Sequence, residues 1–574
     1  MNSSKPGVRL IADACKAKGI RYAVFSPGSR SAPLVIAFSQ IPEIEYIVIP
    51  DERSAGYFAL GLAQQTGIPV AVICTSGTAV LNLGPALCEA FYQHIPLLFL
   101  TADRPEGAAD KGENQAINQA FLFKEMTNGS YDVNADVTGV EEIKSMGGQI
   151  ELAIHQTAQP VPGPVHVNVR LSEPLYELTT EAAPAYQLSA TPTEIKSYSS
   201  STAISELKKQ LSKTTKRLII VGMKDTDREF AEKLQLLAKN DIVVLIETAA
   251  NAVNINPTID PTNTIINYDA CLDLILEKEA KDFAPELVIT FGNQIISKKI
   301  RQFLKANKSR YHWDISPYNE HRKHNIFDID TNAEPISQHD ALECLFSADL
   351  SSPAYASKWQ KLYTSANKLT AEYVAKAPFT DLKVFDLLIK AFPESAHIQY
   401  GNSTPIRYAN FFAHHGRHKV NANRGTSGID GPVSTAAGAA YASKQLTICV
   451  VGDISFFYDS NALWNNYLSP NLRIVLINNS GGNIFRLLKG PTTVSDFEKF
   501  FETKHNLTAK HLAAMYEIPY YFCDQQEGLE KLLPDFFQPQ NGKPAILEIK
   551  TDGELSAKVY KEYFEFLKNN ANSQ

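Results

Sequence analysis

The chain has 574 residues, of which 44% are hydrophobic and 20% are charged, a composition typical of a folded protein with several domains. It excludes a disordered or fibrous protein, and no apolar run reaches the roughly 18 residues that a membrane span requires. The formal net charge of -7 and the absence of a lysine or arginine block argue against nucleic acid as a partner. Charged residues interrupt the apolar positions near the N-terminus, so we expect a cytoplasmic protein without a secretory signal.

Short β-branched or aromatic runs alternate with helical stretches, which predicts parallel sheets covered by helices on both faces. These runs form three groups. The first comprises RYAVFSPG, EYIVIPDE, VAVICTSG, LLFLTADRP and VHVNVR, the second RLIIVGM, IVVLIET and ELVITFGN, and the third HIQYGNS, TICVVGD, RIVLINNSGG and AILEIKT. We therefore predict an α/β protein with three tandem, doubly wound parallel-sheet domains.

The predicted domains cover residues 1–180, 204–350 and 358–574. Two Ser-, Thr- and Pro-rich stretches, residues 176–203 and 346–357, are the predicted linkers. Ligands of open parallel sheets bind at the carboxyl ends of the strands, so the informative residues should follow the strands directly.

Several common motifs are absent. No two of the 30 glycines are separated by a single residue, so the chain has no GxGxxG dinucleotide fingerprint. The one Gly-Lys pair is followed by proline, which excludes a P-loop, and no zinc-ligand spacing occurs. The seven cysteines are scattered without any CxxC pair, so we expect reduced residues in the core.

Polar residues follow two strands of the third group. Asp453 ends one apolar run, and Asn479 ends the next, 26 residues later. Carboxylate, amide and carbonyl oxygens suit a hard cation such as Mg2+, which is often shared with a diphosphate. Each half alone is more simply a helix cap or a turn, but the pair resembles the GDG…NN metal and diphosphate motif of thiamine diphosphate enzymes, with Ile454 in place of the last glycine.

Glu52 is the candidate for the other half of such a site, which needs a carboxylate beside the pyrimidine ring of the cofactor. It follows the run EYIVIP and opens the helical stretch RSAGYFALGLAQQTG. An acidic residue is common at a helix N-terminus for electrostatic reasons alone, so only the wider pattern favours the catalytic interpretation.

That pattern extends over nearly the whole chain, with SPGSRSAPL, DERSAGYFALGLA, TSGTAVLNLGPAL, LTADRP, GENQAINQ, GNSTPIR, NRGTSGIDG and GDIS…NNSGGNIF in this order. The sequence resembles the family of 2-succinyl-5-enolpyruvyl-6-hydroxy-3-cyclohexene-1-carboxylate (SEPHCHC) synthases, thiamine diphosphate enzymes of menaquinone or phylloquinone biosynthesis. The resemblance implies the thiamine diphosphate-binding fold. It also implies decarboxylation of 2-oxoglutarate and 1,4-addition of the succinyl unit to isochorismate.

The resemblance implies a role for each motif residue. Glu52 would activate the cofactor, and the remaining cofactor contacts would be Ser403, Ile429, Gly452, Ile454 and Ser455. The ligands of Mg2+ or Mn2+ would be Asp453, Asn479 and Gly481. The substrates would contact Ser29, Arg30, Arg104, Asn114, Gln115, Lys298, Lys299, Arg407, Arg424, Ile484, Phe485 and Leu488.

Basic residues at strand ends of an acidic protein agree with two dicarboxylate substrates, although each one singly is more often a surface charge. Lys299 departs from relatives that carry arginine there, so its substrate contact depends on a point charge rather than a bidentate fork. The resemblance further implies a homodimer or homotetramer with active sites at subunit interfaces.

Two alternatives stay open on the sequence. Another thiamine diphosphate-dependent decarboxylase or carboligase, of the acetohydroxyacid synthase type, would share Glu52 and the metal motif but take small monocarboxylates. A catalytically silent protein of this fold would be expected to lack Glu52, Asp453 or Asn479, and all three are present.

Overall fold

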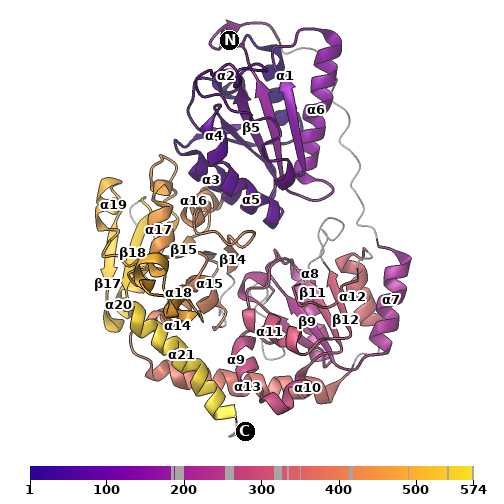
Figure 1. Ribbon diagram of the computed structural model, residues 1–574, viewed down its shortest axis with the longest axis vertical. Helices are drawn as coiled ribbons and strands as arrows, with labels where there is room; N and C mark the ends of the chain where they lie inside the picture. The colour runs from indigo at the N-terminus through magenta and orange to yellow at the C-terminus, as the bar shows by residue number, and fades with distance from the viewer. Residues whose placement is uncertain are drawn as a thin grey trace.

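The computed structural model describes residues 1–182, 186–187, 199–252, 264–315, 326–332, 335–348, 351–412, 418–488, 490–538 and 542–571. Three parallel sheets, each flanked by helices, follow one another along the chain. In Figure 1 the N-terminal unit lies at the top, the middle unit at the lower right and the C-terminal unit at the lower left. The α/β fold class and the three tandem units are as predicted.

The N-terminal sheet has the strand order β3-β2-β4-β5-β7-β6, with all neighbours parallel. Its strands are β2 Tyr22–Phe25, β3 Glu45–Val48, β4 Val70–Cys74, β5 Leu97–Asp103, β6 Gly129–Asn134 and β7 Pro164–Arg170. Its helices are α1 Pro6–Ala17, α2 Ala32–Ser39, α3 Glu52–Thr66, α4 Thr78–Asn82, α5 Gly84–Gln93 and α6 Val140–Ala158. The short strands β1 Asn2–Ser3 and β8 Leu178–Thr179 pair antiparallel beside them.

The middle sheet has the order β10-β9-β11-β12. Its strands are β9 Arg217–Val221, β10 Val243–Ile246, β11 Leu287–Phe291 and β12 Tyr311–Ile315. Its helices are α7 Ser201–Ser212, α8 Arg228–Lys239, α9 Tyr268–Leu274, α10 Ala280–Phe283, α11 Lys298–Ala306 and α12 Gln338–Ser347.

The C-terminal sheet has the order β14-β13-β15-β16-β18-β17, again with all neighbours parallel. Its strands are β13 His397–Tyr400, β14 Lys419–Ala422, β15 Thr447–Gly452, β16 Leu472–Asn478, β17 Tyr520–Cys523 and β18 Ala545–Lys550. Its helices are α13 Pro353–Lys376, α14 Asp381–Ala391, α15 Thr404–Ala409, α16 Pro432–Ala442, α17 Asp453–Tyr458, α18 Ile484–Leu487, α19 Lys510–Met515, α20 Gln526–Phe536 and α21 Gly553–Asn570. The strands therefore pair in the same chain order as those of the N-terminal sheet.

The predicted linkers were too long. The first, residues 176–203, contains β8, and its end is already helical because α7 starts at Ser201. The second, residues 346–357, is shortened from both sides by the end of α12 at Ser347 and the start of α13 at Pro353. Residues 183–185, 188–198, 349 and 350 of these stretches lie outside the described residues.

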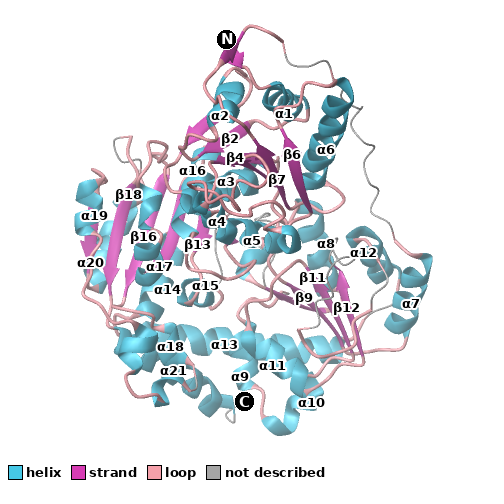
Figure 2. Cartoon of the chain, turned by 45° about the horizontal axis from the view of Figure 1, so that its top comes forward, coloured by secondary structure: helices cyan, strands magenta, loops and turns pink. Residues whose placement is uncertain are grey.

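Helices join the units through shared cores. Helices α3 and α16 lie side by side between the N-terminal and C-terminal sheets (Figure 1), and one apolar cluster includes side chains from both units. A second cluster joins the middle and C-terminal units, where α13 and α21 both contact α9 along the lower side of the molecule (Figure 2). The carboxyl ends of strands in different units are thereby held in fixed relation to one another.

All seven cysteines are free, and six of them are buried, as the sequence predicts. Among the described residues, no helix combines the length and the apolar character needed to span a membrane.

Candidate active site

Glu52 is the first residue of α3, at the carboxyl end of the N-terminal sheet. The preceding Asp51 caps this helix by accepting hydrogen bonds from the backbone N–H groups of Arg53 and Ser54. Burial raises the pKa of Glu52, which lies at a junction with the C-terminal unit. At this junction Arg53 donates to the backbone carbonyl of Asp430, and its guanidinium lies 3.8 Å from the carboxylate of Asp459.

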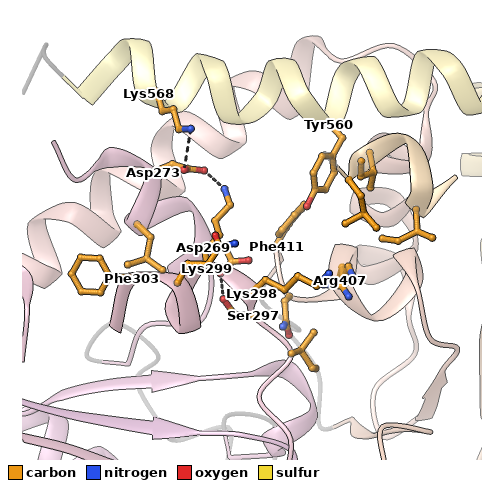
Figure 3. Close-up of a pocket in the computed structure, with 17 residues that line it drawn as sticks. Asp269, Asp273, Ser297, Lys298, Lys299, Phe303, Arg407, Phe411, Tyr560 and Lys568 are labelled. Carbon is orange, nitrogen blue, oxygen red and sulfur yellow. Dashed lines mark hydrogen bonds and ion pairs between the residues drawn. The ribbon is translucent and has the colours of Figure 1, made fainter. Parts of the chain in front are cut away.

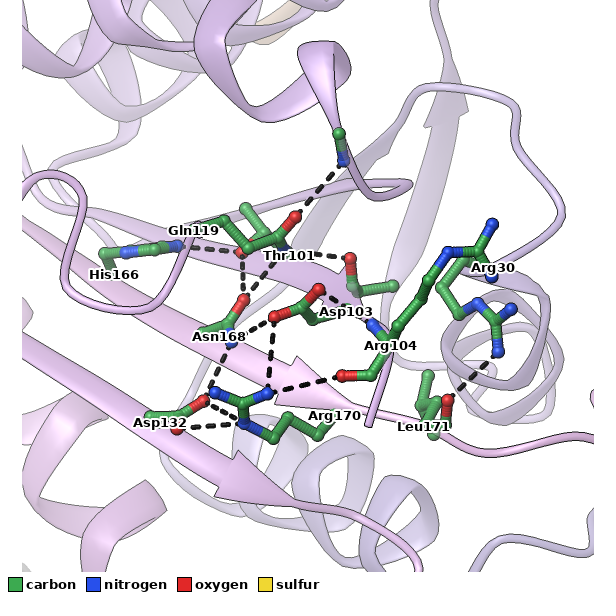
Figure 4. Close-up of polar contacts among 12 residues, drawn as sticks. Arg30, Thr101, Asp103, Arg104, Gln119, Asp132, His166, Asn168, Arg170 and Leu171 are labelled. Carbon is green, nitrogen blue, oxygen red and sulfur yellow. Dashed lines mark hydrogen bonds and ion pairs between the residues drawn. The ribbon is translucent and has the colours of Figure 1, made fainter. Parts of the chain in front are cut away.

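Arg30 and Arg104 lie at the same edge of the N-terminal sheet, after β2 and β5 (Figure 4). Arg30 is buried, donates to the carbonyl of Leu171 at 3.0 Å and pairs with Glu173 at 2.9 Å. Arg104 donates to the backbone carbonyl of Asn114 at 2.8 Å. The predicted contacts Ser29, Asn114 and Gln115 are exposed at this edge.

A buried amide anchors the loop that carries Asn114 and Gln115. Gln119 donates to the carbonyl of Ala102 at 3.0 Å and to Asn168 Oδ1 at 2.7 Å, and its own oxygen accepts from the backbone of Gly77 at 3.2 Å (Figure 4). Asn168 in turn donates to Asp103 and Asp132, both at 2.8 Å. The network fixes the loop against the ends of β5 and β7, because each of its groups is held by the next.

Asp453 and Asn479 come together as predicted, at the ends of β15 and β16. The two Asp453 oxygens accept from the backbone N–H groups of Ile454 at 2.7 Å and Gly481 at 2.9 Å. Asn479 donates to Asp381 at 2.9 Å, while its buried amide oxygen has no hydrogen-bond partner within the part of the chain that the structure describes. An orphaned buried acceptor beside a carboxylate fits a cation, because leaving such an oxygen unpaired would otherwise cost free energy.

The rest of the donor set agrees with a cation held jointly with a diphosphate. The described residues contain no group of three or more His, Cys, Asp or Glu side chains that could hold a metal alone. Mg2+ is commonly bound by one or two protein groups together with substrate phosphates, so one carboxylate and one amide suffice. The Gly481 carbonyl accepts from the N–H of Asn483 at 2.8 Å and keeps a second lone pair.

The predicted cofactor residues lie in loops around these strand ends. The carbonyl of Ile429 accepts from the Ser455 hydroxyl at 2.7 Å, and the carbonyl of Gly428 accepts from Asn402 at 2.5 Å. Ser403 adopts a left-handed backbone with φ of 73° at the start of α15. Apart from its neighbours in the chain, no described residue places an atom within 4 Å of the position that a Cβ on Gly452 would take, so there is open space beside this residue.

A cavity of about 610 Å³ opens between the middle and C-terminal units (Figure 3). Its lining includes five predicted substrate residues: Lys298, Lys299, Arg407, Ile484 and Leu488. This volume suits a small metabolite. The buried Nε atom of the half-buried Arg407 has no hydrogen-bond partner among the described residues, which leaves a donor for an anionic ligand.

Lys299 is engaged within the protein. Its ammonium pairs with Asp273, which also lies 3.8 Å from Lys568 (Figure 3). The same ammonium lies 3.1 Å from the ring centroid of Phe564. Its direct substrate contact therefore stays a prediction, while Lys298 is exposed at the cavity.

The cavity does not collect every predicted substrate residue. Arg424 and Phe485 lie outside the lining, as do all five residues of the N-terminal unit. Ten of the twelve candidate substrate residues thus form one group at the edge of the N-terminal sheet and another at the cavity, and Arg424 and Phe485 belong to neither.

Sequence reasoning missed several residues that hold the site. Asp381 orients Asn479, Gln119 anchors the N-terminal loop, and His505 places Nε2 3.4 Å from the carboxylate of Asp453. Glu89 accepts from the backbone N–H groups of Gly425 and Thr426, both at 2.7 Å. Asp381, His505 and Glu89 are remote in sequence from the motifs they support, so no local pattern signals them. Gln119 lies within the GENQAINQ motif, but the sequence does not show its buried contacts.

Comparison with known proteins identifies the family of this chain. Residues 6–122 match the model of the thiamine pyrophosphate enzyme N-terminal TPP binding domain, and residues 401–549 match that of the C-terminal TPP binding domain. A 2-succinyl-5-enolpyruvyl-6-hydroxy-3-cyclohexene-1-carboxylate synthase of Flavobacterium johnsoniae is 38% identical over 97% of this chain and 98% of its own length. The chain belongs to the SEPHCHC synthase family.

Two further SEPHCHC synthases support the assignment over the full length. The relative from Christiangramia forsetii is 36% identical and that from Bacteroides fragilis 33% identical, each over 99% of this chain and the whole of the relative. None of these relatives is named as an acetohydroxyacid synthase, so the comparisons favour the SEPHCHC synthase family over that alternative.

Proposed function

We propose that the protein is a SEPHCHC synthase, which decarboxylates 2-oxoglutarate and adds the succinyl unit to isochorismate, releasing CO2, in menaquinone or phylloquinone biosynthesis. One observation carries this proposal beyond the family relation. The cavity beside the metal loop presents Lys298 and Arg407 next to the apolar side chains of Ile484 and Leu488. This combination suits dicarboxylates with an uncharged carbon skeleton.

Asp453, Asn479 and the Gly481 carbonyl would hold Mg2+ or Mn2+, and the cation would hold the diphosphate of the cofactor. Ser403, Ile429 and the backbone from Gly452 to Ser455 would contact the cofactor itself. When bound, thiamine diphosphate supplies the nucleophilic carbon that takes up the 2-oxoacid and allows loss of CO2.

Glu52 would hold the proton at the pyrimidine nitrogen. Burial raises the pKa of its carboxyl group, which favours the protonated form that such a contact needs. Asp51 caps α3 immediately before Glu52, which holds the backbone that carries this carboxyl group.

The cationic residues would bind the carboxylates of the two substrates, and the apolar wall would exclude water from the reacting carbon. Arg30, Arg104, Ser29, Asn114 and Gln115 would contribute from the N-terminal unit. Lys298, Arg407 and Arg424 would contribute from the other two, with Ile484, Phe485 and Leu488 as the wall.

We further propose a homodimer, or a tetramer of two such dimers, in which the N-terminal unit of one subunit serves the C-terminal unit of the other. The family relation supports this arrangement. The large α3–α16 surface, which already joins an N-terminal and a C-terminal unit, is the contact that two subunits would exchange.

The test is a reconstitution with purified protein, thiamine diphosphate, Mg2+, 2-oxoglutarate and isochorismate, with each component omitted in turn. Mass spectrometry should detect isochorismate plus a four-carbon succinyl unit in the complete mixture alone. Release of CO2 without loss of isochorismate would show that the acceptor is wrong. Absence of any turnover, with the cofactor still bound, would favour a catalytically silent protein.

A further inference from the structure

A short segment after β10 contacts all three parts of the chain that carry the inner cationic residues. This segment, residues 247–251, follows the carboxyl end of a middle-sheet strand and includes a 3-10 turn at Thr248–Ala250. It lies against the start of α11, against the end of α15 and against β14. These elements carry or precede Lys298, Arg407 and Arg424, respectively.

Glu247 makes the contact with α11. Its carboxylate is 1% exposed and accepts from the backbone N–H of Ile296 at 2.7 Å and of Ser297 at 2.9 Å. It also accepts from the hydroxyl of Tyr268 on α9 at 2.8 Å. Ser297 caps α11, and Lys298 is the first residue of that helix, so the carboxylate fixes the backbone from which Lys298 projects.

The other two contacts come from Thr248 and Asn251. The Thr248 backbone N–H donates to Asn410 at 3.0 Å. The Thr248 hydroxyl donates at 3.1 Å to the carbonyl of Ala409, which is the last residue of α15. Asn251 accepts from the N–H of Val420 at 2.7 Å and donates to the carbonyl of the same residue at 3.0 Å. The segment therefore ties the middle unit to the two C-terminal elements that present arginines.

Four cationic residues repel one another beside this segment: Lys298, Arg301, Arg407 and Arg424. We call these four residues the cation cluster. Burial lowers the pKa of Lys298, and the three arginines lower it further. Burial likewise lowers the pKa of Arg424 to about 10, and Arg407 adds to this effect. Tyr560, Asp269 and Glu247 oppose the lowering at Arg407, and Glu247 and Glu89 oppose it at Arg424, so Glu247 is the carboxylate that acts on both arginines.

We propose that Glu247 is a positioning residue for substrate binding. It holds the start of α11 and offsets the repulsion within the cation cluster. The inference rests on the proposed function, since it assumes that these cations bind a dicarboxylate. Glu247 itself faces backbone N–H groups and a hydroxyl and acts through Lys298 and the arginines.

The test compares the holoenzyme with a Glu247→Gln variant, which keeps the shape of the side chain and removes its charge. The KM for at least one of 2-oxoglutarate and isochorismate should rise about tenfold, within the range measured for residues that share one polar network. The kcat and the affinity for thiamine diphosphate should change by less than about twofold, because the cofactor site keeps its own contacts.

Asp314→Asn is the matched control. This carboxylate is also buried in the middle sheet and accepts from Thr290 at 2.8 Å, and it lies on β12 rather than beside α11. Its KM values should match those of the wild type. Equal rises in both variants would overturn the proposal, because the effect would then come from general loosening of the middle unit.

Combination with Lys298→Met separates positioning from a merely structural role. If Glu247 acts through Lys298, the double variant should have nearly the KM of Lys298→Met alone, whereas independent roles would multiply the two effects. If Glu247→Gln does not fold, Tyr268→Phe takes its place, with an expected rise in KM of about threefold for the loss of one hydrogen bond.

Unchanged KM values in the folded variant would overturn the inference while leaving the proposed function intact. A wild-type enzyme without turnover in the complete mixture would instead contradict the proposed function itself.

Discussion

The side-chain amide of Asn479 shows how one buried carboxylate can prepare a metal ligand. A side-chain amide can be turned by half a rotation, so its oxygen faces the metal only if the nitrogen is held elsewhere. Asp381 provides that restraint by accepting from Asn479 Nδ2 at 2.9 Å, and it is itself fixed by Thr551 at 2.7 Å and Ser556 at 3.2 Å. The orphaned oxygen of Asn479 is thus the consequence of a contact from α14.

Asp381→Asn should weaken binding of Mg2+ with thiamine diphosphate by about tenfold, because an amide partner no longer fixes which end of Asn479 faces the cation. Titration of the cofactor and metal, followed by protein fluorescence or calorimetry, measures this without turnover. Asp386→Asn is the control on the same helix, since that carboxylate pairs with Lys390. Equal affinity for wild type and Asp381→Asn would contradict the orienting role.

The sequence predicts the candidate site where chemistry and position coincide, as at Asp453 and Asn479. It does not predict how a charge is used, because that depends on neighbours that are remote in the chain. Lys298 and Lys299 both line the cavity, yet Lys299 is paired with Asp273 beside Phe564, while Lys298 is exposed. Adjacent helix positions point about 100° apart, so the two side chains meet different surroundings.

At the scale of elements, α3 and α16 pack more closely than ordinary side chains permit. A Cβ on Gly61 would lie 2.0 Å from the backbone oxygen of Thr435, and a Cβ on Gly438 would lie 2.0 Å from that of Phe58. Each helix thus places a glycine against the backbone of the other. Polar contacts continue this surface, including Gln399 to Gln64 at 2.8 Å.

Gly438→Ala should therefore destabilise the protein by about 1–3 kcal/mol, because the added methyl group overpacks against backbone that cannot rotate away. Chemical denaturation measures the change. Gly148→Ala in α6 is the control, since among the described residues a Cβ there meets only the Tyr186 hydroxyl, at 4.0 Å, and it should be neutral or stabilise by about 0.5–1 kcal/mol. A Gly438→Ala variant as stable as the wild type would show that α3 and α16 do not pack this closely.

The sequence predicts every central strand of the three parallel sheets but only two of their six edge strands, β3 and β10. Continuous apolar runs identify β4, β9, β15 and β16, which are buried on both faces. In the parallel sheets the missed strands are β6, β12, β14 and β17, and each is the last strand at one side of its sheet. The two-residue strands β1 and β8 are missed as well. The half-exposed GSYDVN of β6 lacks the apolar run of a central strand, so its pairing becomes evident only in the assembled sheet.

At the scale of the whole molecule, the N-terminal and C-terminal sheets share one strand order, and the middle sheet has only the first four strands of it. The sequence predicts three similar units but not that the first and third pack together, since α3 and α16 are separated by several hundred residues. In this chain that packing places the start of α3 beside Asp430 and Asp459. A second copy could make the same contact if the two chains exchange their N-terminal units.

Mixing two inactive variants distinguishes exchange from a site built by one chain. Glu52→Gln removes the carboxyl of the N-terminal unit, and Asp453→Ala removes the metal ligand of the C-terminal unit. If subunits share their sites, a mixed dimer has one site with both substitutions and one with neither. Random reassortment makes half of the dimers mixed, so about a quarter of the wild-type activity should return.

Each variant alone should stay inactive, which fixes the baseline of the mixing experiment. If each chain instead supplies both Glu52 and Asp453 to its own site, every site in every dimer carries one substitution, and no mixing ratio restores turnover. Absence of recovery in mixtures that demonstrably contain mixed dimers would therefore reject exchange. It would leave the α3–α16 contact as one made within the chain, with the dimer no longer required for a complete site.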